Sequence, residues 1–295
     1  MKNLVFIFRK IFNIYIIKRI FVERLTEPLH LNIISIFILI FGSFRAKIYF
    51  DLILRCQHSY ALLQAADYAR YLGFKSITVI EFGVASGAGL LNICDVARGV
   101  TRITGVDFNI IGFDTGHGMP PPESYRDHPD LYAKGDFPMD VDALRRRLPS
   151  NAKIIIGDVS LTIKDFLCKS TAESPIAFVS IDVDYYSSTR DAFLLFDGES
   201  PLYLPRVQIY LDDLDDLEDM AHNSWCGELF AVNEFNSMRE MRKIERHKFL
   251  RGYRVFKNAR WIDHMFQLHV LDHKVRYKIP ENQLRDPVIL SNPYL

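Results

Sequence analysis

The chain has 295 residues, which is enough for one α/β domain with an added segment or for two small domains. It contains 36 basic and 36 acidic residues, so its formal net charge is +0, and this balance gives no indication of a nucleic-acid partner. Its four cysteines, at positions 56, 94, 168 and 226, are widely spaced and form no C-x-x-C pair. This spacing predicts reduced thiols in a cytoplasmic protein, with neither a zinc site nor a disulfide framework.

The first 44 residues contain two apolar stretches. Residues 1–25 mix large apolar side chains with six basic residues against one acid, Glu23. The basic pairs interrupt the apolar runs before they reach the roughly 20 residues of a membrane span, and no signal-peptide cleavage site follows. The second stretch, residues 31–41, is also too short to span a bilayer and is interpreted as a buried helix or a dimer face.

Two interpretations of these stretches are open. In the first, residues 1–25 form a basic amphipathic helix on an anionic membrane surface, so that residues 1–44 would place a cytoplasmic protein at the inner face of the membrane. Alternatively, they pack on the protein itself or on a second subunit, as in a homo-oligomer. A third helical stretch, about 50–72, leads into the core. We therefore divide the chain into an N-terminal helical region, residues 1–70, and a core, residues 71–295.

The core begins with a β-branched run, residues 76–80, followed by Glu81 and then by Gly83, Gly87 and Gly89. An apolar helical pattern resumes at Leu90, so the sequence predicts a strand, a tight turn and a helix. The glycine spacing does not fit a dinucleotide fingerprint, and the Gly-Lys-Ser/Thr of a phosphate-binding loop is absent. A carboxylate at the strand end suits a cationic amino-acid ligand better than a pyrophosphate.

Two further strands are predicted to end in acids. The strand before Asp114 leads into a loop rich in glycine and proline, 115–122, that would form the wall of a pocket. Asp114 could accept hydrogen bonds from a ribose diol or could cap the next element. A helical stretch, 141–148, precedes a strand that ends in Asp158, and this carboxylate could accept from an exocyclic amine.

The next two predicted strands deliver four acids. Residues 176–181 lead into Asp182 and Asp184, which would share a face if the strand continued that far. Residues 207–211 lead into Asp212 and Asp213. Converging carboxylates form the all-oxygen site that Mg²⁺ prefers, whereas the alternative is that these acids cap helices or face water.

The C-terminal part is predicted to close the sheet edge with a hairpin pair of strands, formed by residues 253–256 and 264–271. Its histidines have no metal-site spacing and are interpreted as structural. The tail after Lys278 is interpreted as peripheral.

Six segments together resemble the class I S-adenosylmethionine-dependent methyltransferases, and among them the macrocin O-methyltransferase type. They are 81–87 (EFGVASG), 113–120 (FDTGHGMP), 156–158 (IGD), 181–189 (IDVDYYSST), 211–213 (LDD) and 231–235 (AVNEF). The resemblance covers roughly residues 70 to 240 and implies a Rossmann-like α/β fold, with a mostly parallel seven-stranded sheet flanked by helices. The loop after Asp114 departs from the family pattern, in which Asp-Ser-Phe-x-Gly-Leu-Pro is expected, and this departure concerns the acceptor pocket.

The resemblance also implies roles for individual residues. The methionine part of S-adenosylmethionine would lie against Glu81, Gly83, Ser86 and Gly87, its ribose against Asp114, and its adenine amine against Asp158. The metal ligands would be Asp182, Asp212 and Asp213, with Asp184 near the acceptor. The catalytic candidates are Asp182, Asp184, His117 and His222, and the sequence does not decide which of the last three takes the proton.

The resulting functional hypothesis is Mg²⁺-assisted transfer of a methyl group from S-adenosylmethionine to a hydroxyl of a sugar or another hydroxylated small molecule. One alternative is a hydroxylase-like relative with the same fold. Another is a membrane-surface scaffold whose methyltransferase-like core is not catalytic. A nicotinamide dehydrogenase is disfavoured because the glycine spacing does not fit its fingerprint.

Overall fold

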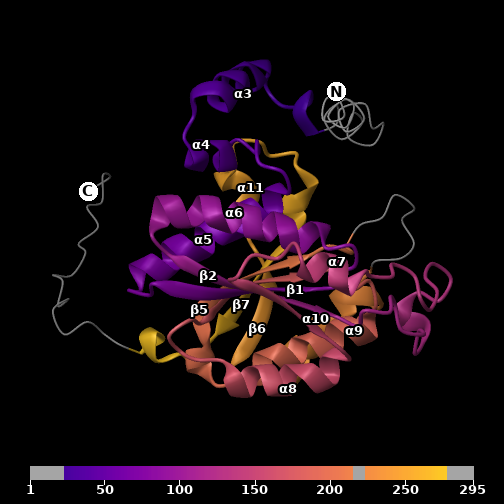
Figure 1. Cartoon of the computed structure of the whole chain (residues 1–295). Coiled ribbons are helices and arrows are strands. Elements are labelled where there is room, and N and C mark those ends of the chain that lie inside the picture. Colours follow the sequence, from indigo (N-terminus) through magenta and orange to yellow (C-terminus); the bar gives the residue numbers. More distant parts are fainter. Residues whose placement is uncertain (1–22, 215–222, 278–295) are drawn as a thin grey trace, which may run out of the picture.

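A seven-stranded sheet forms the centre of the computed structural model, which describes residues 23–214 and 223–277 (Figure 1). The strand order is β3-β2-β1-β4-β5-β7-β6. The strands are β1 Ser76–Phe82, β2 Asp107–Asp114, β3 Ala152–Ile156, β4 Ile176–Ile181, β5 Tyr203–Leu211, β6 Arg242–Arg246 and β7 Met265–Val270. Strands β1 to β5 are parallel, and β7 runs antiparallel to both β5 and β6.

The central strands are apolar because both of their faces are covered. All six residues of β4 are buried, as are six of the seven in β1. Continuous apolar runs of this kind are typical of parallel strands that lie between two layers of helices. The predicted fold class, a Rossmann-like, mostly parallel sheet flanked by helices, is confirmed by this topology.

Helices cover both faces of the sheet (Figure 1). One layer contains α5 Cys56–Tyr71, α6 Ala88–Thr104 and the short α7 Val141–Arg145. The other contains α8 Val159–Lys169, α9 Tyr186–Ala192 and α10 Gly227–Met238. Short 3₁₀ helices cover Tyr125–Asp127, Phe193–Asp197, Ser200–Leu202, Arg260–His264 and Lys274–Arg276.

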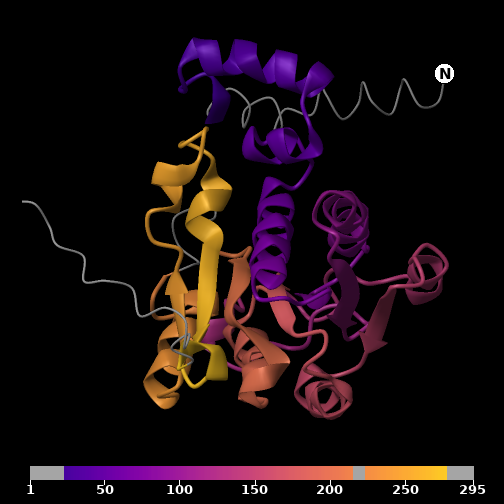
Figure 2. The same cartoon turned by 90° about the vertical axis from the view of Figure 1, so that its left-hand side faces the viewer.

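Two N-terminal helices, α3 Leu29–Phe41 and α4 Phe44–Tyr49, lie beyond the α5 and α6 layer, at the opposite end of the molecule from α8 (Figures 1 and 2). Next to them lies α11 Leu250–Tyr253, from the C-terminal part of the chain. Within the described residues, no helix combines the length and apolar character needed to cross a membrane.

A buried ion pair joins these N- and C-terminal segments. Arg254, which is 3% exposed, donates to a carboxylate oxygen of Asp51 at 2.5 Å and to the backbone carbonyl of Ile48 at 3.0 Å. Arg24 donates to the backbone carbonyls of Phe50 and Asp51 at 2.9 and 2.8 Å. Since a buried charge must be paired, these contacts hold α4 and the chain before α3 firmly against the body.

Several sequence predictions differ from the structure. The predicted strand at 253–256 is wrong: the chain there leaves α11, and Arg254 turns inward to pair with Asp51. The strand that does pair with β7 is β6, which the sequence analysis missed because Ile244 is its only large apolar residue. The predicted helices 50–72 and 141–148 are shorter in the structure, as α5 and α7.

Candidate functional site

A cavity of about 770 Å³ lies at the carboxyl ends of β1, β2, β4 and β5. Parallel strands end at the same edge of a sheet, which explains why acids from separate parts of the sequence meet there. The sequence-predicted residues on its wall are Glu81, Gly83, Ser86, Asp114, His117, Asp158, Asp182, Asp184, Asp212 and Asp213. Of the remaining predicted residues, Gly87 does not line the cavity and packs on Leu144, and His222 lies outside the described residues.

Glu81 is a buried carboxyl group on the wall of this cavity. It is 1% exposed, and its Oε2 atom has no hydrogen-bond partner. Burial and the nearby Asp182 carboxylate raise its pKa well above the ordinary value, and Arg55 offsets only part of this effect. A buried acceptor without a partner is costly, so the site is suited to a ligand that brings a cationic donor, such as an α-ammonium group.

Three glycines allow the turn after β1 to pack closely against its neighbours. A Cβ atom at position 89 would lie 1.9 Å from Oε1 of Glu81, so only glycine fits there. Gly83 has a φ of +78°, and a Cβ there would lie 1.6 Å from the backbone oxygen of Asp182. Gly87, at the N-cap of α6 with a φ of +84°, packs on Leu144. The glycine spacing therefore serves the packing of the turn as well as access to the cavity.

Asp114 clamps the glycine turn to β2. Its Oδ2 atom accepts from the backbone N–H groups of Val84 and Ala85, both at 2.9 Å, and its Oδ1 atom accepts from that of Gly116 at 2.7 Å. A carboxylate oxygen has more than one acceptor position, so Asp114 can still receive a ribose hydroxyl from the cavity.

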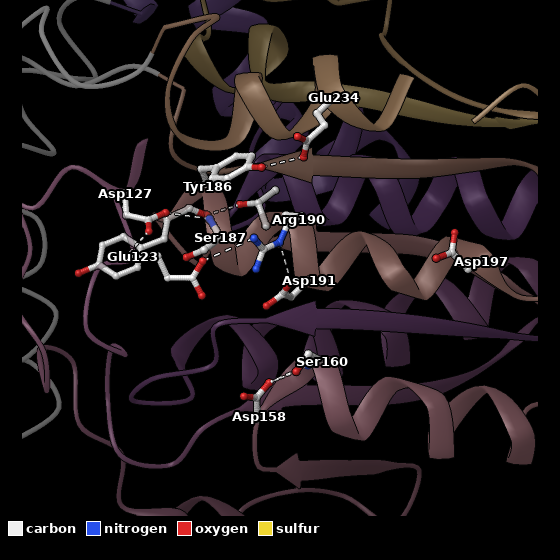
Figure 3. Close-up of polar contacts among 12 residues, drawn as sticks. Glu123, Asp127, Asp158, Ser160, Tyr186, Ser187, Arg190, Asp191, Asp197 and Glu234 are labelled. Carbon is white, nitrogen blue, oxygen red and sulfur yellow. Dashed lines mark hydrogen bonds and ion pairs between the residues drawn. The ribbon is translucent and has the colours of Figure 1, made fainter. Parts of the chain in front are cut away.

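Asp158 has a structural role that the sequence analysis did not assign. It is the N-cap of α8, and its Oδ1 atom accepts from the backbone N–H of Ser160 at 2.8 Å and from its hydroxyl at 2.6 Å (Figure 3). Both bonds use the same oxygen. The residue is exposed on the cavity wall, where its Oδ2 atom can accept from a ligand amine.

Asp182, Asp212 and Asp213 converge in the same cavity. One carboxylate oxygen from each lies within 4.8 Å of the others. Asp182 follows β4 and the other two follow β5, and these strands are parallel neighbours. Three carboxylates at this separation form an oxygen donor set of the kind that Mg²⁺ prefers.

Asp184 reaches this cluster by a route that the sequence did not indicate. Strand β4 ends at Ile181, so Asp182 and Asp184 do not share a strand face. Instead, Asp184 adopts a left-handed conformation with a φ of +58°, and its backbone N–H donates to Oδ2 of Asp213 at 3.0 Å. A single left-handed residue thus turns the chain back toward the acids of β5.

The crowding of these acids changes their titration. Burial and the neighbouring Asp212 raise the pKa of Asp182 to about 8. The pKa of Asp213 is also raised well above the ordinary value, by burial and by Glu228, and that of Asp184 is raised by burial. In the absence of a counter-ion Asp182, Asp184 and Asp213 therefore favour the protonated form, and a divalent cation would favour the ionised form.

This crowding predicts a pH dependence of stability in EDTA. The folded pKa of Asp182, about 8, exceeds its ordinary value of 3.8, so its contribution is fully present below pH 3.8 and is lost as the pH rises toward 8. We expect the unfolding free energy of Asp182→Asn to fall less over this interval than that of the wild type. Urea unfolding at a series of pH values measures both slopes, and equal slopes would contradict the electrostatic interpretation.

Two buried acids beside the site were missed by the sequence analysis. Glu228, in the first turn of α10, is fully buried, and its Oε2 atom accepts from the backbone N–H of Asp213 at 3.1 Å. Asp127, also fully buried, accepts from the backbone N–H groups of Ser187 and Glu123 at 2.8 and 2.7 Å (Figure 3). Neither stands at a strand end, which was the signal that identified the other acids.

Asp127 connects the loop after β2 to α9. This loop contributes His117 and Glu123 to the cavity wall, and Arg190 of α9 pairs with Glu123 at 3.5 Å (Figure 3). His117 is exposed on the cavity wall. The loop therefore forms one wall of the cavity, and Asp127 fixes it to α9.

No family model and no curated protein sequence matches the chain. Among solved structures, it is similar to the O-methyltransferase NovP, with 18% identity, coverage of 62% of this chain and 72% of that one, and a TM-score of 0.44. It is also similar to the calicheamicin methyltransferase CalS11, with 19% identity, coverage of 71% and 84%, and a TM-score of 0.46. It is similar as well to the O-methyltransferase TomG from Streptomyces achromogenes, with 14% identity, coverage of 76% of this chain and 85% of that one, and a TM-score of 0.37. The fold is established by the strand order of this chain.

Proposed function

We propose that this chain is an S-adenosylmethionine-dependent O-methyltransferase that uses a divalent cation to methylate a hydroxyl of a small molecule, such as a sugar. The observation that carries the proposal is the composition of one cavity. It contains a buried, unpartnered carboxyl oxygen of Glu81 beside a glycine turn, together with the converging carboxylates of Asp182, Asp212 and Asp213.

The cofactor would be held by residues that have free acceptor capacity. Glu81 would pair with the α-ammonium group, while Gly83 and Ser86 leave the backbone accessible on the cavity wall. Asp114 and Asp158 would accept from the ribose hydroxyls and the adenine amine with the lone pairs that their backbone contacts leave unused. When bound, S-adenosylmethionine supplies an electrophilic methyl group on its sulfonium centre.

The acidic cluster would orient the acceptor hydroxyl and accept its proton. Asp182, Asp212 and Asp213 would hold Mg²⁺, which supplies Lewis acidity that lowers the pKa of a hydroxyl. Asp184 would act as the general base, because its backbone contact with Asp213 keeps it at the cluster. Alignment of the acceptor in the cavity, between these acids and the loop after β2, would supply much of the rate enhancement.

Titration calorimetry of the purified chain with S-adenosylmethionine and S-adenosylhomocysteine tests the proposal, with Mg²⁺ and with EDTA. We expect dissociation constants in the micromolar range for both ligands and no binding of NAD⁺, whose fingerprint is absent. A folded protein that binds neither ligand would contradict the proposal and favour the scaffold alternative. Oxygen consumption by an iron-loaded sample would favour the hydroxylase-like alternative. No disulfide joins the four cysteines, all of which lie in the described part of the chain, and this supports a cytoplasmic location for the reaction.

A further inference from the structure

Helix α3 exposes apolar side chains that the described part of the chain does not cover, so the interpretation of residues 31–41 as a buried helix is wrong. Its sequence, LHLNIISIFILIF, has no charged Asp, Glu, Lys or Arg residue, and Ser35 is its one buried residue. Eight of its large apolar side chains are between 42% and 70% exposed: Leu29, Ile33, Ile34, Ile36, Phe37, Leu39, Ile40 and Phe41. Exposed apolar surface of this extent on a soluble domain marks a site of interaction.

The exposed side chains are spread around the helix. At about 100° per residue, the arc from Leu39 through Leu29 to Ile34 covers roughly 220° of the circumference. A helix that packs on one protein partner needs an apolar stripe of only about 100°. A lipid phase can contact all sides of a protruding helix, so the width of this arc favours lipid over a second copy of the chain.

Helix α11 extends the apolar surface. Figures 1 and 2 both show it beside the N-terminal helices, and Phe249 and Tyr253 at its two ends are 78% and 79% exposed. The chain just before α3 contacts the chain just after α11, because Glu27 accepts from the backbone N–H of Asn258 at 2.6 Å and the Arg24 guanidinium stacks 3.7 Å from the Phe256 ring centre. We name the eight exposed residues of α3 together with Phe249 and Tyr253 the α3–α11 surface.

Basic residues accompany this surface. The segment 246–260, which includes α11, contains no acidic residue, and its Lys248, Lys257 and Arg260 are exposed, with Lys248 paired to Glu245 just before the segment. The sequence that precedes the described N-terminal helices, residues 1–22, contains five basic residues and no acidic one. Apolar side chains with flanking basic residues are complementary to a bilayer that contains anionic lipid.

We propose that the α3–α11 surface docks the protein on an anionic lipid bilayer. Helix α3 has 13 residues and is about 20 Å long, shorter than the roughly 30 Å hydrocarbon core, so it would lie within the interface and not span it. The contacts among Arg24, Asp51 and Arg254 would hold the helix to the body, which fixes the orientation of the bound protein. This inference does not depend on the proposed methyl transfer.

Vesicle flotation of the full chain tests the docking, with vesicles of phosphatidylcholine alone and of phosphatidylcholine mixed with phosphatidylglycerol. We expect flotation with the anionic vesicles that weakens as salt is added. We expect Phe37→Ser/Ile40→Ser to weaken binding about tenfold or more, since it removes two large apolar contacts. The double variant Phe249→Ser/Tyr253→Ser is expected to weaken binding in the same direction.

The matched control is Leu161→Ser/Met238→Ser, which changes two side chains that are 73% and 72% exposed on α8 and α10, in the layer opposite the N-terminal helices. It should float like the wild type. Thermal unfolding of each variant confirms that it is folded. Flotation of Phe37→Ser/Ile40→Ser at wild-type strength would overturn the proposal. So would a wild type that does not float but forms a dimer which Phe37→Ser/Ile40→Ser dissociates, because that result assigns the surface to a second copy.

Discussion

Replacement of Glu81 with glutamine is expected to weaken binding of S-adenosylmethionine and S-adenosylhomocysteine by about 100-fold or more, with the fold retained. Glutamine keeps the size and shape of the side chain beside Gly89 but cannot carry the negative charge that would pair with an α-ammonium group. Burial raises the pKa of Glu81 in the free protein, so the fold does not depend on the charged form. Both ligands contain the same amino-acid moiety, and we expect equal losses for the two.

Calorimetry with the wild type and Glu81→Gln measures this effect, and thermal unfolding reports the stability of each. Glu228→Gln is the matched control. Glu228 is also fully buried with an unpartnered carboxyl oxygen, but it does not lie on the cavity wall. Unchanged affinity in Glu81→Gln, or an equal loss in both variants, would show that Glu81 does not recognise the ligand directly.

The sequence predicted the parts of the site that follow from local pattern. Apolar runs identified the parallel strands, and the acid after each run marked the sheet edge where Glu81, Asp114, Asp182 and Asp212 now lie. This inference works because all parallel strands end at one edge, so their terminal residues are neighbours whatever their separation in sequence. The antiparallel β7 was also predicted, from its own apolar alternation.

The parts that the sequence did not predict depend on conformations or contacts that leave no local pattern. Asp184 was predicted at the site, but it joins the acids through its own left-handed conformation and not along a strand face, and Glu228 contacts Asp213 from a helix 15 residues farther along the chain. Arg254 is paired with Asp51 across 203 residues, and this burial converted a predicted strand into a connection. Each of these features is a tertiary effect that overrides local propensity.

The double replacement Asp212→Asn/Asp213→Asn is expected to abolish binding of Mg²⁺ or Mn²⁺ in the cavity and, with it, methyl transfer. The change removes two of three anionic ligands but preserves the local hydrogen bonds. An asparagine carbonyl can still accept from the Tyr210 hydroxyl, which lies 2.6 Å from Asp212, and from the Asp184 N–H, which lies 3.0 Å from Asp213. The loss of mutual repulsion offsets any loss of packing, so the metal-free variant should fold at least as stably as the wild type.

The measurement is thermal and urea unfolding with and without the cation. A cation at about 100 times its dissociation constant stabilises the protein that binds it by about 2.7 kcal/mol, so the wild type should show a clear shift. The double variant should show none. Asp158→Asn is the control, since Asp158 lies on the same cavity wall but outside the three converging acids, and it should respond like the wild type. A double variant that keeps the wild-type increase in stability with the cation binds that cation elsewhere. The three carboxylates would then have another role, as acids that share protons and orient the acceptor without a metal.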